Sequence, residues 1–220
     1  MIFKEGRMSS KGDFTIFKNT KVLVSTPLPD NIDLGRILSR LESEIPWHFC
    51  EDLDVIYIGI FDFLIDRELN ALYQDGAVYV SSVQDDEEDL YDDLAHEIAH
   101  CVEESYTESV YGDDTIESEF LVKRKQLFNI LKSEGLASSI EPFMEPRYNK
   151  SFDEYLYIEV GYPVLMGLTK GLFVSPYGAT SLREYFANCF EEIYAKKNAQ
   201  HVKKLSPTVY KKILSMTEDY

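Results

Sequence analysis

Two histidines four residues apart, with a glutamate directly after the first, form the most informative pattern in this sequence: His96-Glu97-Ile98-Ala99-His100. On an α-helix, residues i and i+4 lie one above the other, so both imidazoles face the same way. At this spacing two imidazole nitrogens can bind one tetrahedral Zn²⁺ ion at about 2.0–2.1 Å. Glu97 is rotated by about 100° from His96, so it is placed to contact a water molecule rather than to act as a ligand. The pattern predicts a zinc site with a general base beside it.

A helix from Asp85 to Glu104 is predicted to present this pattern. Its acidic first turns suit the positive end of a helix dipole. Its apolar residues gather on the side opposite the two histidines, which predicts that the helix packs on the core and turns the histidines toward a cleft. These apolar residues are Leu94, Ile98, Cys101 and Val102.

The sequence near the motif does not supply an obvious third ligand, and a zinc peptidase needs three protein ligands and one open position for water. The spacing HExxHxxGxxH is absent, because Glu103 and Tyr106 occupy its glycine and histidine positions. His48 and His201 are isolated, and we expect them to be structural or surface residues. Glu104 lies four residues after His100 on the same face, but three ligands on one straight helix would span about 12 Å.

Glu184 is the second candidate for the third ligand. It belongs to the predicted helix Ser181–Lys197, where Glu184 and Asn188 lie opposite the apolar stripe. Two helices of this kind can share a metal ion between them. However, Ser181-x-x-Glu184 also matches a capping box, in which the glutamate bonds the backbone amide of the serine. The pattern alone is compatible with a cap or a ligand.

The motif at residues 96–100 and the later segment Tyr177-(x6)-Glu184-Tyr185-Phe186-Ala187 together resemble a known family of zincin metallopeptidases. This family includes the protease domain of anthrax lethal factor and the clostridial Pro-Pro endopeptidases. The resemblance implies that Glu184 is the third zinc ligand and that the Tyr177 hydroxyl stabilises the oxyanion. Asn188 stands where the family often has a second glutamate, a difference that concerns support of the metal rather than the ligand itself.

Charge and composition exclude several classes of protein. The 220 residues are 45% hydrophobic, which is enough for a sizeable core, and the net charge of −17 argues against a nucleic-acid partner. Residues 51–120 hold 22 acids and one base, Arg67, and such a field attracts cations and basic peptides. The sequence has no apolar run long enough for a membrane span and no visible secretory signal, so we expect a cytoplasmic protein. Three cysteines without a CxxC pair fit buried, reduced thiols.

The hydrophobic pattern predicts an α+β, zincin-like fold in a single domain, with a sheet lobe at residues 1–83 and a helical lobe at 84–220. A helix over residues 34–45 is expected to back a small mixed sheet. The predicted strands are Lys21–Thr26, Asp54–Phe61 and an edge strand at Ala77–Ser82, and the later helices are Ile116–Ser133, Tyr155–Leu168, Ser181–Lys197 and Pro207–Met216.

These observations together predict a zinc-dependent peptidase whose substrate is a peptide or protein. His96, His100 and Glu184 would hold Zn²⁺, Glu97 would act as general base, and Tyr177 would stabilise the oxyanion. An extended substrate would pair with the predicted edge strand by strand addition, through Ala77, Val78, Tyr79, Val80 and Ser81. Two alternatives remain open: a zincin of another class with a different third ligand, and a non-catalytic binding protein that keeps the zincin shape.

Overall fold

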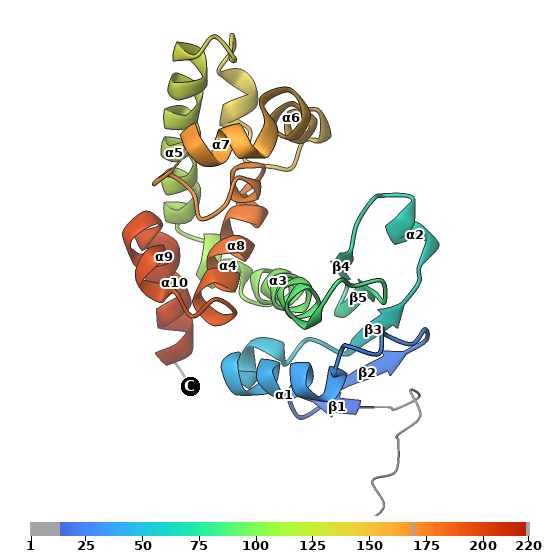
Figure 1. The fold of residues 1–220 in the computed structure, drawn as a ribbon. Coiled ribbons are helices and arrows are strands. Elements are labelled where there is room, and N and C mark those ends of the chain that lie inside the picture. Colours follow the sequence, from blue (N-terminus) through green and yellow to red (C-terminus); the bar gives the residue numbers. More distant parts are fainter. Residues whose placement is uncertain (1–13, 169, 219–220) are drawn as a thin grey trace, which may run out of the picture. The chain divides into compact units, whose positions relative to one another are not determined.

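The computed structural model describes residues 14–168 and 170–218, and these residues form an α+β chain (Figure 1). The chain folds as two compact units that divide between Cys101 and Val102. This division lies inside one long helix, α3 (Glu87–Ser105). The end of the strand pattern marks the end of the sheet, but α3 continues to pack with the first unit for several turns.

The first unit is built on a mixed sheet, which has five strands among the described residues. Its order is β1-β2-β3-β5-β4, with a parallel centre and an antiparallel strand at each edge. In the register of the centre, Val22 lies opposite Ile56, and Ile56 lies opposite Val78; all three side chains are fully buried. The strands are β1 (Phe14–Ile16), β2 (Thr20–Val24), β3 (Val55–Gly59), β4 (Ala71–Gln74) and β5 (Ala77–Ser81).

Strand β4 was not expected from the sequence, and it changes the position of β5 in the sheet. β4 and β5 form a hairpin whose turn residues, Asp75 and Gly76, both have positive φ angles (49° and 77°). An Asp-Gly pair is a typical two-residue hairpin turn, so this signal was present in the sequence. Because β3 and β4 pair with the two sides of β5, the prediction that Ala77–Ser82 forms an edge strand is wrong.

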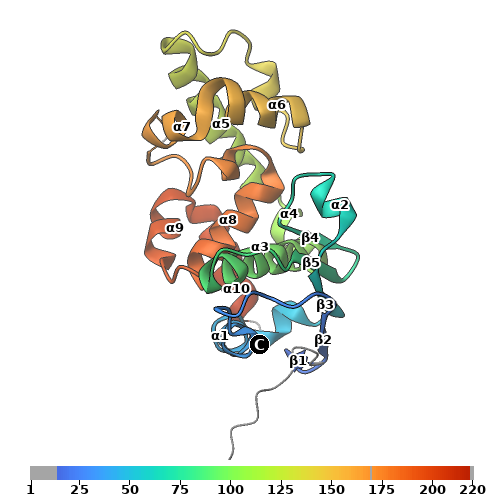
Figure 2. The same ribbon diagram turned by 45° about the vertical axis from the view of Figure 1, so that its right-hand side comes forward.

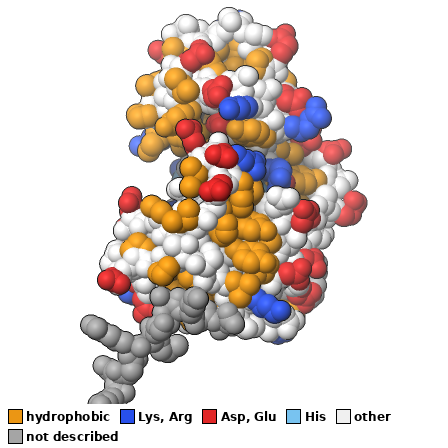
Figure 3. Space-filling model, turned by 90° about the vertical axis from the view of Figure 1, so that its right-hand side faces the viewer, with side chains coloured by type: hydrophobic (Ala, Val, Ile, Leu, Met, Phe, Trp, Pro, Cys, Tyr) orange, Lys and Arg blue, Asp and Glu red, His pale blue; other side chains and the backbone are white. Residues whose placement is uncertain are grey.

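The face of the sheet opposite Ile56 and Val78 carries aromatic side chains. Tyr57 and Tyr79 are stacked with ring centroids 5.0 Å apart, and Phe61 and Phe63 meet Tyr79 edge-on. Tyr57 and Tyr79 are half-buried, whereas Ile56 and Val78, which point the opposite way, are fully buried. Hydrophobic side chains gather on the face of the molecule shown in Figure 3.

The first turns of α3 are held to α1 (Leu34–Glu44), the helix that connects β2 to β3. Arg40 donates two hydrogen bonds to the Glu88 carboxylate, at 2.6 and 3.1 Å, and its guanidinium lies 3.7 Å from the Tyr91 ring centroid. The Tyr91 hydroxyl donates to Glu44 at 2.5 Å. These contacts fix the start of the helix that carries both histidines of the motif.

The second unit is helical. Helices α8 (Leu182–Tyr194), α9 (Ala199–Leu205) and α10 (Pro207–Glu218) lie side by side (Figures 1 and 2). Helix α5 (Thr115–Ser133) and the later α8 and α10 match the predicted helices closely. The predicted helix at 155–168 is a π-helical segment, Tyr155–Gly161, which continues into α7 (Tyr162–Leu168). The remaining helices are α4 (Thr107–Tyr111) and α6 (Lys150–Glu154), and a short helix of the first unit, α2, covers Asp62–Ile65.

No helix in the described part of the chain is long and apolar enough to cross a membrane. The three cysteines, all within this part, are buried, as the sequence predicts.

Candidate metal centre

Helix α3 presents both histidines of the motif on one face. Leu94, Ile98 and Val102 are fully buried, in agreement with the predicted apolar stripe. His100 is only 7% exposed and His96 is half-buried. The two imidazole rings meet edge-on, with centroids 5.1 Å apart. One turn of helix therefore supplies two adjacent nitrogen donors.

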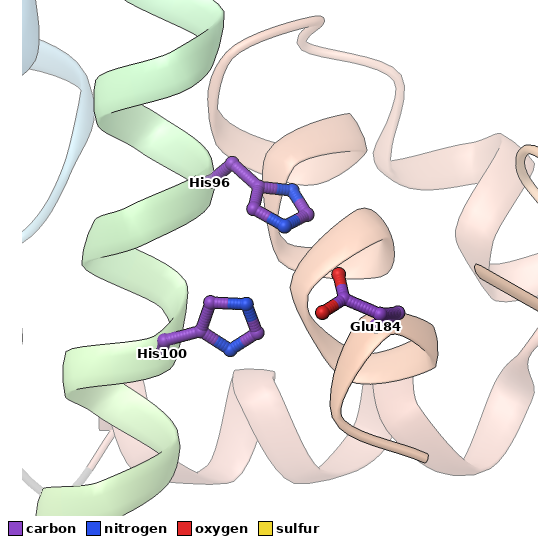
Figure 4. Close-up of side chains that lie close together, drawn as sticks. All are labelled: His96, His100 and Glu184. Carbon is purple, nitrogen blue, oxygen red and sulfur yellow. The ribbon is translucent and has the colours of Figure 1, made fainter. Parts of the chain in front are cut away.

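Glu184, on the first turn of α8, joins these two rings. His96, His100 and Glu184 each offer a ligand atom, and these atoms all lie within 4.8 Å of one another (Figure 4). The Ser181 side chain caps α8 by accepting from the Glu184 backbone amide at 3.2 Å. The amide of Glu184 thus takes part in the cap through the Ser181 hydroxyl, while its carboxylate faces the imidazoles (Figure 4).

The chemistry of this donor set fits Zn²⁺. Two imidazole nitrogens and one carboxylate oxygen leave a fourth tetrahedral position for water. Atoms bound to one tetrahedral zinc ion at about 2.05 Å lie about 3.3 Å apart, and the three ligand atoms here lie within 4.8 Å of one another. Glu104, the local alternative, is exposed and lies outside the cluster. His48 contacts Trp47 and Phe49, and His201 bonds Glu192 at 2.8 Å.

Glu97, the predicted general base, is anchored to the outer strand of the sheet. Its carboxylate accepts a hydrogen bond of 2.6 Å from the backbone amide of Tyr73 in β4, and the residue is 9% exposed. Tyr73 pairs with Val78 in the β4–β5 ladder. The main chain of β4 therefore holds the Glu97 carboxylate in place, through a tertiary contact that helix spacing does not predict.

The prediction that residues 77–81 bind substrate by strand addition does not fit the sheet. Ala77, Val78, Tyr79, Val80 and Ser81 all pair with β3, and the first four also pair with β4. Their main-chain donors and acceptors are therefore already used within the sheet. The outer strand on this side is β4.

Tyr177 lies in a 3₁₀ turn, Tyr177–Ala179, just before α8. Asn188 links this turn to the helix: its amide donates to the Glu184 carbonyl at 2.9 Å, and its oxygen accepts from the Ser175 hydroxyl. Ser175 in turn accepts from the amide of Gly178 at 3.3 Å. Asn188, the position that departs from the resembled family, therefore supports both the Tyr177 turn and the backbone of Glu184.

A buried arginine holds the other side of the same turn. Arg124 is 1% exposed and donates to the carbonyls of Ala179 and Thr180, at 2.5 and 3.1 Å. It also donates to the carbonyls of Phe143 and Pro142, at 3.1 and 2.6 Å. Burial lowers the pKa of this guanidinium to about 9. Sequence patterns could not predict this role, because the acceptors are main-chain atoms from two segments distant from Arg124 in the chain.

Tyr177 belongs to a group of phenols and carboxylates that the sequence did not predict. Asp153 accepts from the hydroxyls of Tyr148 and Tyr162, at 3.1 and 3.4 Å. Burial raises the pKa of Asp153, and the negative charge of Glu184 adds to this effect. Burial also raises the pKa of Tyr177, as do the charges of Glu184 and Asp153, so its hydroxyl keeps its proton and can donate a hydrogen bond.

Four aspartates of the acidic stretch line a cavity at the start of α3. The cavity has a volume of about 390 Å³. Burial raises the pKa of one of its carboxyl groups, Asp93, to about 6. The cavity favours positively charged groups over anions. It is lined by Asn70, Val83, Gln84, Asp85, Asp89, Asp92 and Asp93.

No protein-family model matches this chain, and searches of curated proteins and of solved structures find no match either. Any function assigned to this site must therefore be argued from its own residues and their geometry.

Proposed function

We propose that this chain is a zinc-dependent peptidase of the zincin type. The observation that carries the proposal is the meeting of His96, His100 and Glu184, with their ligand atoms within 4.8 Å of one another. Two imidazoles and one carboxylate with a glutamate beside them are the donor set of a catalytic rather than a structural zinc site. The likeness to the lethal factor protease family at residues 96–100 and 177–187 supports the same proposal.

Zn²⁺, when bound, lowers the pKa of a coordinated water to about 7 and polarises the substrate carbonyl. Glu97 accepts the proton of the attacking water and delivers it to the leaving amine. Its hydrogen bond to the Tyr73 amide fixes the carboxylate, so that the proton acceptor stays in place during both transfers. The protonated hydroxyl of Tyr177 donates to the oxyanion, a contribution of about 3 kcal/mol for one such donor.

The acidic cavity suggests the class of substrate. Its carboxylates lie on the same helix as the histidines and on the segment just before it. We expect this field to favour peptides with basic side chains and to disfavour acidic ones.

Replacing Glu97 by Gln tests the proposal directly. The amide keeps the shape of the side chain and can still accept from Tyr73, but it cannot take a proton. We expect hydrolysis of a peptide library to fall by about 10²- to 10⁴-fold, while zinc content stays at one ion per chain. Glu104→Gln is the matched control, because Glu104 is an exposed carboxylate on the same helix. Equal activity of wild type and Glu97→Gln would refute the enzymatic proposal.

A further inference from the structure

Glu103 is a buried carboxylate on the same face of α3 as the histidines. It follows His96 by seven residues, which is close to two full turns, and it lies about 4.5 Å beyond His100 along the helix axis. Glu103 is only 5% exposed. A charged group in this position needs fixed partners, because burial without them is costly.

Two donors bind Glu103, and all three residues belong to the second unit. Arg183 donates through Nε at 3.0 Å, and the Tyr111 hydroxyl donates at 2.8 Å. Arg183 precedes Glu184 directly and lies in the first turn of α8. The hydrogen bond therefore joins the face of α3 that carries the histidines to the turn of α8 that carries the carboxylate.

We propose that Glu103 and Arg183 are positioning residues, which set the place of Glu184 relative to the two imidazoles. This inference rests on the proposed function, because it concerns the assembly of the same zinc site. Residues 102–105 of α3 and all of α8 belong to the second unit, so this bond holds the two helix segments within one compact unit. Because α3 is continuous, fixing its last turn also fixes His100, which lies less than one turn earlier.

Other bonds also hold the first turn of α8. Ser181 caps the helix and Asn188 bonds the Glu184 carbonyl, and both residues belong to α8 or its cap. The Leu182 amide donates to the Pro146 carbonyl at 2.8 Å, which ties the turn to the segment before α6. These bonds do not join the turn to α3. The Glu103–Arg183 bond, in contrast, ties the turn to the other helix.

The test compares zinc affinity in Glu103→Gln, Arg183→Gln and the double variant. Arg183 is 57% exposed, so its replacement leaves the packing of α8 largely unchanged. Glu88→Gln is the matched control, since it removes a charge from an ion pair at the opposite end of α3. Zinc dissociation constants come from competition with a chromophoric chelator. The visible spectrum of the Co²⁺-substituted protein reports the geometry of the donor set independently of activity.

We expect each single replacement to weaken zinc binding by about 10-fold or more and to alter the Co²⁺ spectrum. The double variant should bind zinc about as tightly as the single variant that has the lower zinc affinity, since both changes break the same contact. Zinc affinity within twofold of wild type in both single variants, or an equal loss in Glu88→Gln, would overturn the positioning role. If the zinc effects appear but wild type cleaves no peptide, the positioning role is supported and the peptidase proposal fails.

Discussion

We predict that the buried carboxyl group of Asp93 makes the free energy of unfolding depend on pH. Its carboxylate accepts from the Gln84 side chain at 3.0 Å, one turn before the motif. Burial raises its pKa to about 6, and the charge of Glu97 adds to the rise, whereas the Gln84 hydrogen bond and His96 oppose it. An aspartate in an unfolded chain has a pKa of about 3.9. Between these two values the folded chain binds more protons at this site than the unfolded chain does.

The sign of the effect follows from this difference. Stability rises with pH where the unfolded state binds more protons, so here it falls. The contribution of Asp93 is fully present below about pH 4 and is lost as the pH rises through about 6. A shift of about two pKa units corresponds to about 3 kcal/mol in the free energy of unfolding. Asp93→Asn removes this dependence, because the amide has the same shape and carries no charge.

The measurement is urea denaturation of chelator-treated wild type and Asp93→Asn at pH 4 and pH 7. We expect the variant to gain about 2 kcal/mol on wild type between these two pH values, because the unfolded aspartate is already about half ionised at pH 4. Asp89→Asn is the control, because Asp89 is an exposed carboxylate one turn earlier on α3. A stability difference between wild type and Asp93→Asn that is the same at both pH values would refute the reasoning.

Three further predictions concern the residues that hold or complete the site. Glu184→Ala should abolish stoichiometric zinc binding in a metal analysis, and Glu104→Ala should not; loss in Glu104→Ala alone would assign the ligand to α3. Tyr177→Phe should lower kcat by about 10²-fold with unchanged zinc content, and an unchanged kcat would remove its role at the oxyanion. Arg124→Met leaves four carbonyls without their donor, so we expect a loss of at least about 3 kcal/mol in urea denaturation; a loss below about 1 kcal/mol would contradict this account.

The helices could be predicted well because their signal is local. A period of 3.6 residues defines α3, α5, α8 and α10, and the same period places His96 and His100 on one face. The sheet was less predictable. The short strand β4 carries too few residues for a clear pattern, and its presence moves β5 from the edge to the interior.

The sequence by itself determined that two imidazoles share one helical face beside Glu97, because helix geometry fixes residues four apart. It left the third member of the cluster undecided, since Ser181-x-x-Glu184 fits both a cap and a ligand. Only the tertiary structure decided that the Glu184 carboxylate lies near the two rings. It also decided that the Tyr73 amide donates to Glu97 and that Arg183 donates to Glu103. These contacts join residues from distant parts of the chain, often through main-chain atoms, and neither spacing nor residue type encodes such pairings.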